Sequence, residues 1–356
     1  MKIGVLTLPF NNNYGGLLQA YALQSYLKQR GHEVYSIQQP LFNIKILSKA
    51  KVKQILKIGT YTNASNMQIF QHQQMQETIP IRNEKDLKKL KKYKFDTLIV
   101  GSDQVWRYEY IKENYSMYFL DFFNSKKISY AASFGKDSWD ATKEVTQKIK
   151  ELIKLFDAVS VREKSGQKIC ENNLNRNDTI NLLDPTLLME DDFYRKLYTG
   201  KETKKKGGIG FYFLDPCEEK IKFVNRFEKA LNLSSFSIGK QINFKPFGVE
   251  HKYPSVAQWL CDFDCADFII TDSFHGMIFA TIFKKEFFIV GNNERGLSRF
   301  DSFLSRIKID NRLSEQNKLM NVYIGDILNK IDYTYINGIF EYNKIQSDIF
   351  LKKQLI

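Results

Sequence analysis

The stretch DFIITDSFHGMIFATIFKKEFFIVG, residues 267–291, holds two apolar strands with one apolar helix between them. DFIIT and EFFIVG are expected to be the strands, and FHGMIFATIF the helix. Such a unit favours a parallel sheet with a right-handed crossover. His275 falls at the turn that follows the first strand. Ser273 or Asp272 can cap the helix without help from an imidazole, so a ligand is the better explanation for the histidine.

The same alternation runs through the whole chain in two series. Strands are expected in KIGVLTL, EVYSIQ, FDTLIVG, KISYAAS, FDAVSV and TINLLD, and then in IGFYFL, SSFSIG, DFIIT and EFFIVG. FDTLIVG is too continuously apolar to be half exposed, which suits the middle of a parallel sheet. The stretch 182–208, with Pro185, an acidic cluster and KETKKKGG, is the best linker candidate. The pattern therefore predicts an α/β fold of two Rossmann-like domains, 1–195 and 205–310, facing a cleft, followed by a helical tail at 311–356.

The composition is that of a soluble globular protein, with 43% hydrophobic and 26% charged residues in a chain of 356. No run of about 18 apolar residues is present to span a membrane. The N-terminus lacks the features of a signal peptide, so a cytoplasmic protein is expected. The four irregularly spaced cysteines, which complete no zinc pattern, are expected to be free thiols; they are Cys170, Cys217, Cys261 and Cys265.

The net charge of +13 is spread unevenly along the chain. Residues 44–96 hold 12 Lys/Arg against 4 Asp/Glu, and include KDLKKLKKYK. Such a surface can attract anionic lipid or phosphorylated substrates, and a solvated helix face explains it equally well. No zinc finger, RNP pattern or KH-type loop accompanies it, so nucleic acid is not expected as a partner.

Two of the informative loops lie in the first series of strands. NNNYGGLLQA, residues 11–20, carries Gly15 and Gly16, which allow close approach of the backbone to a ligand, and leads into a helix whose N–H groups can face an anion. A tight turn explains this loop equally well. GSDQVWR, residues 101–107, places Ser102 and Asp103 after a central strand. They can cap a helix, or they can bind a sugar or supply a base.

Three further loops carry cations. Arg162 follows FDAVSV at the carboxyl end of a strand, and its planar fork suits a carboxylate or phosphate. Arg295 and Arg299, four residues apart after EFFIVG, could bind a second anionic group. His275, in the first turn of its helix, feels the positive end of the helix dipole, which disfavours its protonation. A bound phosphate would reverse this, so the histidine could become a proton donor when the substrate arrives.

Taken together, these loops resemble the polysaccharide pyruvyl transferase family. The resemblance is carried by NYGGLLQAYAL, GSDQVW, ISYAASFG, VSVREKSG, LLDPTLL and TDSFHGMIFA, in this order over about residues 1–310. It implies a fold similar to the GT-B glycosyltransferases, with the acceptor on the first domain and the donor on the second. Many members carry an arginine in the residues just before the histidine, where this chain has Ser273-Phe274.

The resemblance also implies a reaction. Such enzymes move the enolpyruvyl unit of phosphoenolpyruvate onto a sugar diol as a cyclic ketal, without a metal or other cofactor. The implied catalytic residues are His275 as the acid or phosphate partner and Asp103 as the base. The donor-binding residues would be Arg162, Arg295, Arg299 and Ser273, and the acceptor-binding residues Asn13, Tyr14, Gly15, Gly16, Ser102 and Gln104.

Two alternative functions stay open at this stage. One is a GT-B glycosyltransferase whose nucleotide-sugar diphosphate would lie on the same basic loops. The other is a sugar-binding relative without catalysis. The acceptor is expected to be a precursor of a cell-surface polysaccharide such as a capsule or exopolysaccharide. A polyprenyl-diphosphate-linked oligosaccharide would suit this role, with peripheral contact at the inner face of the membrane.

Overall fold

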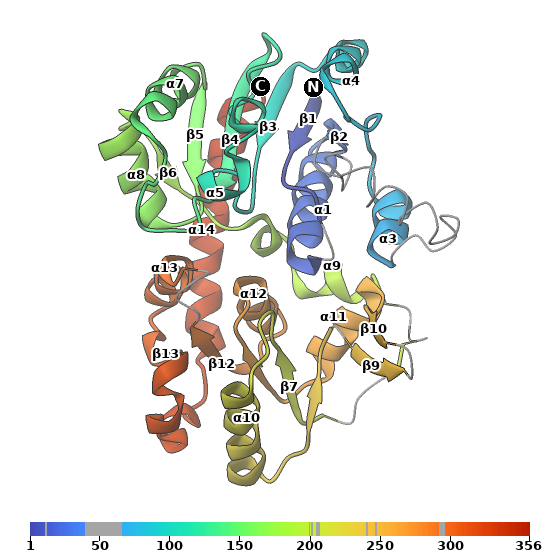
Figure 1. Cartoon of the computed structure of the whole chain (residues 1–356), viewed down its shortest axis with the longest axis vertical. Coiled ribbons are helices and arrows are strands. Elements are labelled where there is room, and N and C mark those ends of the chain that lie inside the picture. The colour runs from blue at the N-terminus through green and yellow to red at the C-terminus, as the bar shows by residue number, and fades with distance from the viewer. Residues whose placement is uncertain are drawn as a thin grey trace.

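The computed structural model describes residues 1–10, 13–39, 66–198, 200, 202–203, 207–239, 241–245, 248–291 and 296–356. Within these residues, two parallel β-sheets lie one above the other along the long axis of the molecule, and helices flank them (Figure 1). The predicted fold class, two Rossmann-like α/β domains, is confirmed.

The first sheet has six parallel strands. In sheet order they are β2 (Glu33–Ser36), β1 (Lys2–Leu6), β3 (Thr97–Val100), β4 (Lys126–Ala132), β5 (Ala158–Val161) and β6 (Ile180–Asn181). The helices of this half are α1 (Tyr14–Lys28), α3 (Asn66–Gln74), α4 (Glu84–Lys89), η2 (Leu90–Tyr93), α5 (Tyr108–Ile111), α6 (Tyr115–Tyr118), α7 (Lys143–Lys154) and α8 (Lys164–Leu174). The chain leaves β1 for β2 on one side and returns to β3 on the other, so the switch point of this sheet lies between β1 and β3.

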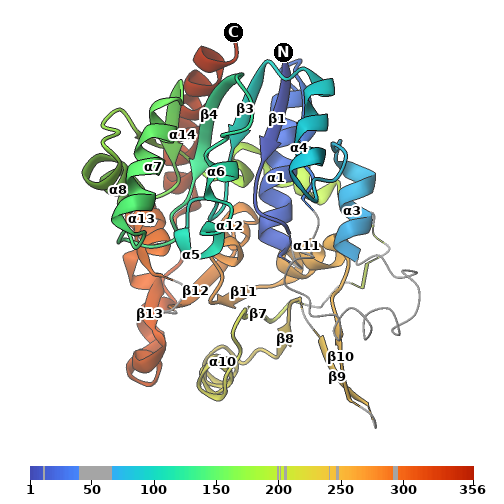
Figure 2. The same ribbon diagram turned by 45° about the horizontal axis from the view of Figure 1, so that its top comes forward.

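Alternate residues of these strands pack into two apolar layers. Ile3, Val5 and Ile99 join the cluster that contains α1 and the C-terminal helix α14 (Tyr333–Gln354). Leu98 and Val100 join the cluster on the other face, with α7 and α8. Figure 2 shows α14 behind β4. Because a strand alternates its side chains between two faces, a strand covered on both sides must be apolar throughout, as the continuous run in β3 predicted.

The second sheet has five parallel strands. In sheet order they are β13 (Leu313–Glu315), β12 (Glu286–Gly291), β11 (Phe268–Thr271), β7 (Ile209–Tyr212) and β8 (Ser235–Ser237). The helices here are α10 (Glu218–Leu231), α11 (Val256–Cys265), α12 (Phe274–Ile282), α13 (Ser298–Ile307), η5 (Asp310–Arg312), η6 (Gln316–Asn321) and η7 (Ile324–Ile327). The switch point of this sheet lies between β7 and β11. The stretch 267–291 forms the expected crossover, β11, α12 and β12.

Two features depart from the expected elements. An antiparallel hairpin of β9 (Gln241–Lys245) and β10 (Gly248–Lys252) precedes α11, and the strand pattern did not predict it. The helical tail expected over 311–356 begins instead with β13, which pairs with β12 at the edge of the second sheet. A three-residue edge strand buries too little apolar surface to leave a clear alternating pattern.

The two halves are tied together by α14. Near its start, the Tyr333 hydroxyl donates to the Lys285 carbonyl beside the second sheet. The helix has 22 residues, about 33 Å of rise. Near its other end, Asp348 accepts from Tyr26 on α1 at 2.8 Å and from Arg30, just after α1, at 2.6 Å. The C-terminus therefore ends close to the N-terminus, at the top of the molecule in Figure 1.

A buried ion pair fixes the switch point of the second sheet. Asp272, directly after β11, accepts from the backbone N–H groups of Leu214 and Asp215 at 2.6 and 3.1 Å. It also accepts from Lys220 Nζ at 2.6 Å, and both side chains of this pair are fully buried. Asp272 thus holds the loop after β7 against the loop after β11. It is Ser273, not Asp272, that caps α12.

Removal of Lys220 should destabilise the protein strongly. Lys220→Ala leaves Asp272 buried without its cation, which costs about 3–5 kcal/mol. Lys222→Ala on the same helix is the matched control, because Lys222 is 61% exposed and pairs with Glu218 at the surface. The control should change the free energy of unfolding far less than Lys220→Ala does, because solvent screens an exposed pair. Denaturant unfolding measures both, and equal losses would contradict the structural role given to the pair.

Candidate active site

The loops predicted to carry chemistry meet where the two sheets face each other. Asn13 and Asp103 follow β1 and β3, the strands that flank the first switch point. His275 follows β11 at the second switch point. His275 comes within 3.4 Å of Asp184, a residue of the first half, so the carboxyl ends of the two sheets face one another across the junction. Open α/β sheets bind ligands at this position.

His275 is buried between the two halves, at 6% exposure. The cap of α12 is a hydrogen bond from Gly276 N to Ser273 Oγ, so the imidazole takes no part in capping. The ring packs directly on Gly15 in the first turn of α1, where an added Cβ would lie 2.2 Å from the ring atoms Cγ and Nδ1. The Gly-Gly loop therefore serves close approach, as the sequence suggested, and the approaching group is a histidine of the other half.

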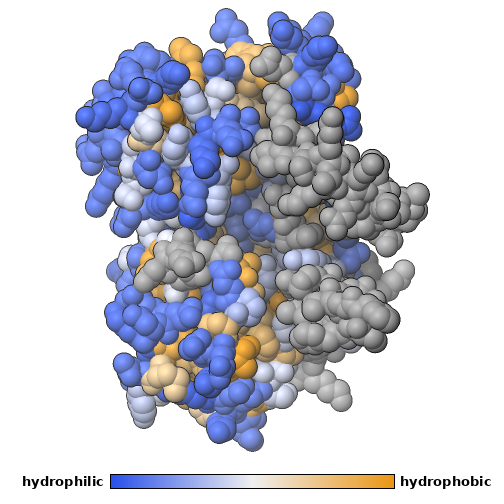
Figure 3. All heavy atoms as spheres, in the orientation of Figure 1, coloured by the Kyte–Doolittle hydropathy of each residue, from blue (hydrophilic) through white to orange (hydrophobic). Residues whose placement is uncertain are grey.

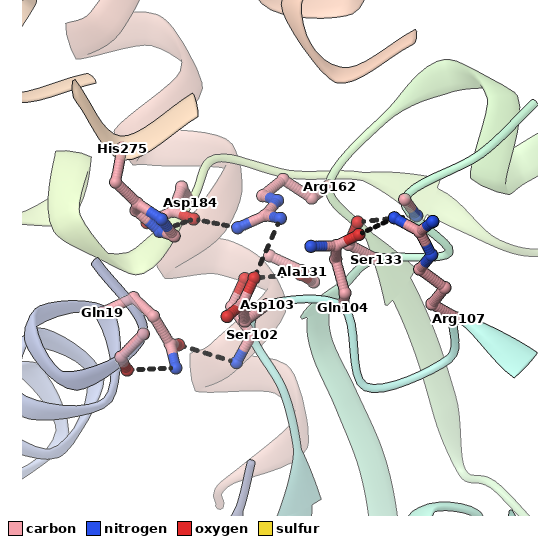
Figure 4. Close-up of polar contacts among 12 residues, drawn as sticks. Gln19, Ser102, Asp103, Gln104, Arg107, Ala131, Ser133, Arg162, Asp184 and His275 are labelled. Carbon is pink, nitrogen blue, oxygen red and sulfur yellow. Dashed lines mark hydrogen bonds and ion pairs between the residues drawn. The ribbon is translucent and has the colours of Figure 1, made fainter. Parts of the chain in front are cut away.

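Arg162 lies at the centre of a buried charge cluster (Figure 4). Its guanidinium donates to Asp184 Oδ2 at 2.7 Å, and is 3.4 Å from Asp103 Oδ1 and 4.0 Å from Glu163 Oε2. The Arg162 side chain is only 2% exposed. Burial opposes ionisation of Asp184, but the charges of His275 and Arg162 outweigh it and hold the pKa of Asp184 well below its usual range. The predicted meeting of Arg162 and His275 thus occurs through a shared carboxylate.

Glu163 is a further buried acid that sequence reasoning did not single out. Its Oε1 accepts from the Ser133 hydroxyl at 3.0 Å, and from the N–H groups of Phe134 and Gly135 at 2.8 and 3.2 Å. Burial raises the pKa of Glu163 above its usual value, although the charges of Arg162 and Arg299 oppose the shift. Glu163 directly follows Arg162 in VSVREKSG, but nothing in that stretch distinguishes it from a surface glutamate.

A small cavity beside this cluster is lined by three arginines. Its volume is about 10 Å³, room for roughly one water molecule. Its lining includes Arg162, Asp184, Phe274, Arg299 and Arg306. Burial and the neighbouring charge of Arg162 lower the pKa of Arg299 to about 10. A site that keeps guanidinium groups this close together, away from water, is suited to an anion.

Arg306 was missed in the sequence, although a signal for it existed. It lies seven residues after Arg299 in α13, two helical turns along the same face, and its guanidinium bonds Asn181 at the end of β6. Burial lowers the pKa of Arg306. The other predicted cation in this region, Arg295, lies outside the described residues.

Phe274 lies in the region where the family resemblance led us to expect an arginine. Its ring lies 4.4 Å from the Arg162 guanidinium carbon and 5.6 Å from that of Arg299. An aromatic face attracts each of these cations while keeping them apart. With Phe274 at this position the site has one positive charge fewer than expected, and the ring contacts both Arg162 and Arg299.

The predicted acceptor residues divide into two groups. Tyr14 and Ser102 are buried, and their hydroxyls donate to the carbonyls of Pro254 and Ala131 at 2.7 Å each. Gly16 N donates to Asn13 Oδ1 at 3.0 Å. These polar groups are satisfied inside the protein, which leaves little for a sugar to bind. Asn13 is exposed and Gln104 is half-buried, so these two side chains are better placed to meet a ligand.

Asp103 is held between the loop before α1 and the charge cluster. Its backbone has φ 66°, a conformation that aspartate tolerates better than most residues. Asn13 Nδ2 lies 3.4 Å from Oδ2, and Oδ1 faces Arg162. One oxygen of Asp103 thus points toward the exposed Asn13 and the other toward the buried cations.

The described part of the chain contains no group of three His, Cys, Asp or Glu side chains arranged to hold a metal ion. All four cysteines are free thiols, as predicted, with Cys261 and Cys265 sulfurs 3.8 Å apart on α11. None of the described helices is both long enough and apolar enough to cross a lipid bilayer. Figure 3 shows a face that is mainly hydrophilic over both halves, with apolar groups scattered among polar ones.

Solved structures with the same architecture are enzymes of the GT-B fold. UDP-N-acetylglucosamine 2-epimerase from Rickettsia bellii superposes with a TM-score of 0.57 at 10% identity, over 99% of this chain and 95% of that one. MnaA from S. aureus, solved with UDP, gives 0.54 at 11% identity over 100% and 97%. UGT89C1 from Arabidopsis thaliana, also with UDP, gives 0.54 at 10% identity over 100% of both chains. At these identities the likeness establishes the GT-B fold alone.

Sequence comparison identifies the family. No curated protein matches the chain significantly in sequence. The model of the family described as polysaccharide pyruvyl transferase matches residues 13–294, from the loop before α1 to the loop after β12. This span includes Asp103, Arg162 and His275, and covers most of both halves. The chain belongs to the polysaccharide pyruvyl transferase family.

Proposed function

We propose that this protein transfers the enolpyruvyl unit of phosphoenolpyruvate onto a sugar diol and closes it as a cyclic ketal. The observation that supports this most is the convergence of His275, Arg162 and Arg299 at the junction of the two sheets. Phosphoenolpyruvate carries a carboxylate and a phosphate close together, so it needs two or more convergent cations and a proton donor. The site offers both in a buried setting.

In this reaction His275 donates a proton to the methylene carbon of the donor, which leaves an oxocarbenium-like centre at C2. A sugar hydroxyl adds to C2 and gives its proton to Asp103. The bond from C2 to the phosphate oxygen then breaks, and the electron pair leaves with the phosphate, which Arg299 and Arg306 would bind. The departing phosphate takes the proton held by Asp103. The second hydroxyl then adds to C2 and gives its proton to the neutral imidazole of His275, which completes the ketal and restores both residues.

The donor needs more room than the cavity in this structure provides, since about 10 Å³ holds a single water. We propose that the two halves move apart to admit it. The cavity lining mixes charged and apolar side chains, and a charged donor could replace the one ion pair that crosses the junction there, between His275 and Asp184. Hinge motion of this kind is common in two-domain enzymes.

We propose, from the family resemblance, that the acceptor is a precursor of a cell-surface polysaccharide. Such a precursor could be linked to a polyprenyl diphosphate. The lysine-rich segment 44–96 is described only from residue 66 onward. There, Lys88, Lys89, Lys91 and Lys92 lie on exposed parts of α4 and η2, where they could approach an anionic membrane surface.

Substitution of Arg299 and of Arg162 should have different effects on donor affinity and on protein stability. Arg299→Met removes a buried cation that Arg162 repels and that Asp103 and Glu163 attract, so it should cost less stability than Arg162→Met while donor affinity falls roughly 30- to 1000-fold. Arg162→Met removes the partner of three carboxylates and should cost about 3–5 kcal/mol of stability. Calorimetry with phosphoenolpyruvate and denaturant unfolding measure the two effects. Arg82→Met is the surface control, since Arg82 is exposed; full donor affinity in Arg299→Met would contradict the anion site.

His275 should act in the chemical step and not in donor binding. His275→Asn is expected to lower turnover about 10²- to 10⁴-fold with a much smaller change in donor affinity. Gly15→Ala should produce a similar defect with His275 still present, because the added methyl would displace the imidazole. Gly338→Ala is the control, since open space surrounds that position in α14. Acceptor-dependent phosphate release is the assay; normal turnover in His275→Asn would refute the role of the histidine.

A further inference from the structure

The LLDPTLL motif contributes Asp184, a buried residue that has no role in the proposed reaction as described above. Asp184 follows β6 and begins the short helix η3 (Pro185–Leu188). Its Oδ1 accepts from Thr186 N at 3.0 Å and from the Thr186 hydroxyl at 2.7 Å. These two bonds fix the rotation of the carboxylate. Its other oxygen is thereby aimed at the junction between the two halves.

That second oxygen, Oδ2, faces two nitrogen-bearing side chains, those of Arg162 and His275. Arg162 donates to it at 2.7 Å, and His275 Nε2 lies 3.4 Å from it. Nε2 is buried and has no hydrogen-bond partner among the described residues, so the Asp184 oxygen at 3.4 Å is a neighbour at ion-pair distance that a small rotation of the ring would bring into a hydrogen bond. The opposite edge of the ring, with Nδ1, lies over Gly15, where only the lack of a side chain leaves room.

We infer that Asp184 is a positioning residue that orients the imidazole of His275 through Nε2. Nε2 keeps its proton throughout the reaction and shares it with Oδ2 in a hydrogen bond. The negative charge of Asp184 also favours the charged imidazole, since two opposite charges stabilise each other mutually. The low pKa of Asp184 agrees with this, because it keeps the carboxylate ionised throughout the working range.

The other charges near His275 act mainly through Asp184. Arg162 binds the same oxygen and weakens its pull on the imidazole, while Asp103 and Glu163 lie on the far side of Arg162. Phe274, the neighbour of His275 on α12, meets the ring edge to face at 5.5 Å and carries no charge. The first turn of α1 contributes Gly15 and its backbone. Asp184 is therefore the charge with the most direct effect.

The pairing can be tested without any substrate. The chain has four histidines, His32, His72, His251 and His275, so ¹⁵N-histidine NMR of the full protein is simple to assign with His275→Asn. The neutral form of His275 should carry its proton on Nε2. In Asp184→Asn this preference should weaken, and His275 should lose its charge at a lower pH than in the wild type. An unchanged tautomer and titration in Asp184→Asn would overturn the inference.

The effect on catalysis rests on the proposed function and is measured separately. Asp184→Asn should lower turnover with phosphoenolpyruvate by about tenfold or more, and move the alkaline limb of the rate profile to lower pH. In the His275→Asn background the same change should alter turnover by less than about twofold, because the two residues act as one unit. An additive loss, or an unmoved profile, would show a merely structural role and overturn the inference.

Two further variants keep these outcomes distinct. Asp264→Asn is the matched control. Like Asp184, Asp264 forms an ion pair with an arginine: it lies on α11, 2.9 Å from Arg195 on α9 (Asp191–Arg195), and it does not contact His275. It should leave the rate profile unmoved. If Asp184→Asn does not fold, Thr186→Val, which removes one bond that orients Asp184, should shift the profile less in the same direction; no shift would overturn the inference. If the wild type shows no pyruvyl transfer, the proposed function fails while NMR still decides the pairing.

Discussion

The contact between Asp184 and its two partners is the constraint on which the junction of this molecule depends. One carboxylate, 1% exposed, meets an arginine of its own half and a histidine of the other. Breaking a buried pair by removing one partner is costly, because the remaining charge is left without compensation. The loops after β5, β6 and β11 are therefore held in one arrangement. That arrangement sets where a substrate can meet His275.

The same constraint explains why the first turn of α1 has no side chain at Gly15. The imidazole can reach Asp184 only by passing close to the backbone of α1, and a Cβ there would lie 2.2 Å from the ring. On its other side, α1 is fixed by the stacking of Tyr14 on Trp259, with ring centroids 5.2 Å apart. The glycine and the tyrosine together dock the start of one half onto two helices of the other. These contacts between the two halves are made by the protein alone and do not depend on a bound substrate.

Much of this organisation could be predicted from the sequence, because strand and helix periodicity are local properties. The apolar runs in β3, β11 and β12 placed the loops that follow them, and parallel strands bring those loops to one edge. This was enough to predict from the sequence that Arg162 and His275 lie at one site. The same reasoning assigned Tyr14 and Ser102 to a ligand, since it cannot tell whether a polar group at a strand end faces the cleft or is bonded inside the protein.

The residues missed by sequence reasoning share a different property. Asp184 and Glu163 each owe their importance to contacts with segments far away in the chain, such as Arg162 with His275 for the first and the turn at 133–135 for the second. An isolated carboxylate beside an arginine or a proline carries no local pattern that distinguishes it from a surface residue. Only the three-dimensional arrangement shows that each is nearly or fully enclosed.

The balance of charge at the junction suggests how a ligand and the protein would adjust to each other. Arg162, Arg299 and Arg306 are offset by Asp103, Glu163 and Asp184, so the cluster is near neutral when His275 carries no charge. A donor with two or three negative charges would upset this balance in a setting that screens charge poorly. Protons are the quickest compensation, and two groups are suited to take them up. His275 can become charged, and Glu163, whose pKa burial has already raised, can become neutral. In the proposed reaction, the proton taken up by His275 is the one later given to the methylene carbon of the donor. Binding of the substrate would therefore also protonate the general acid.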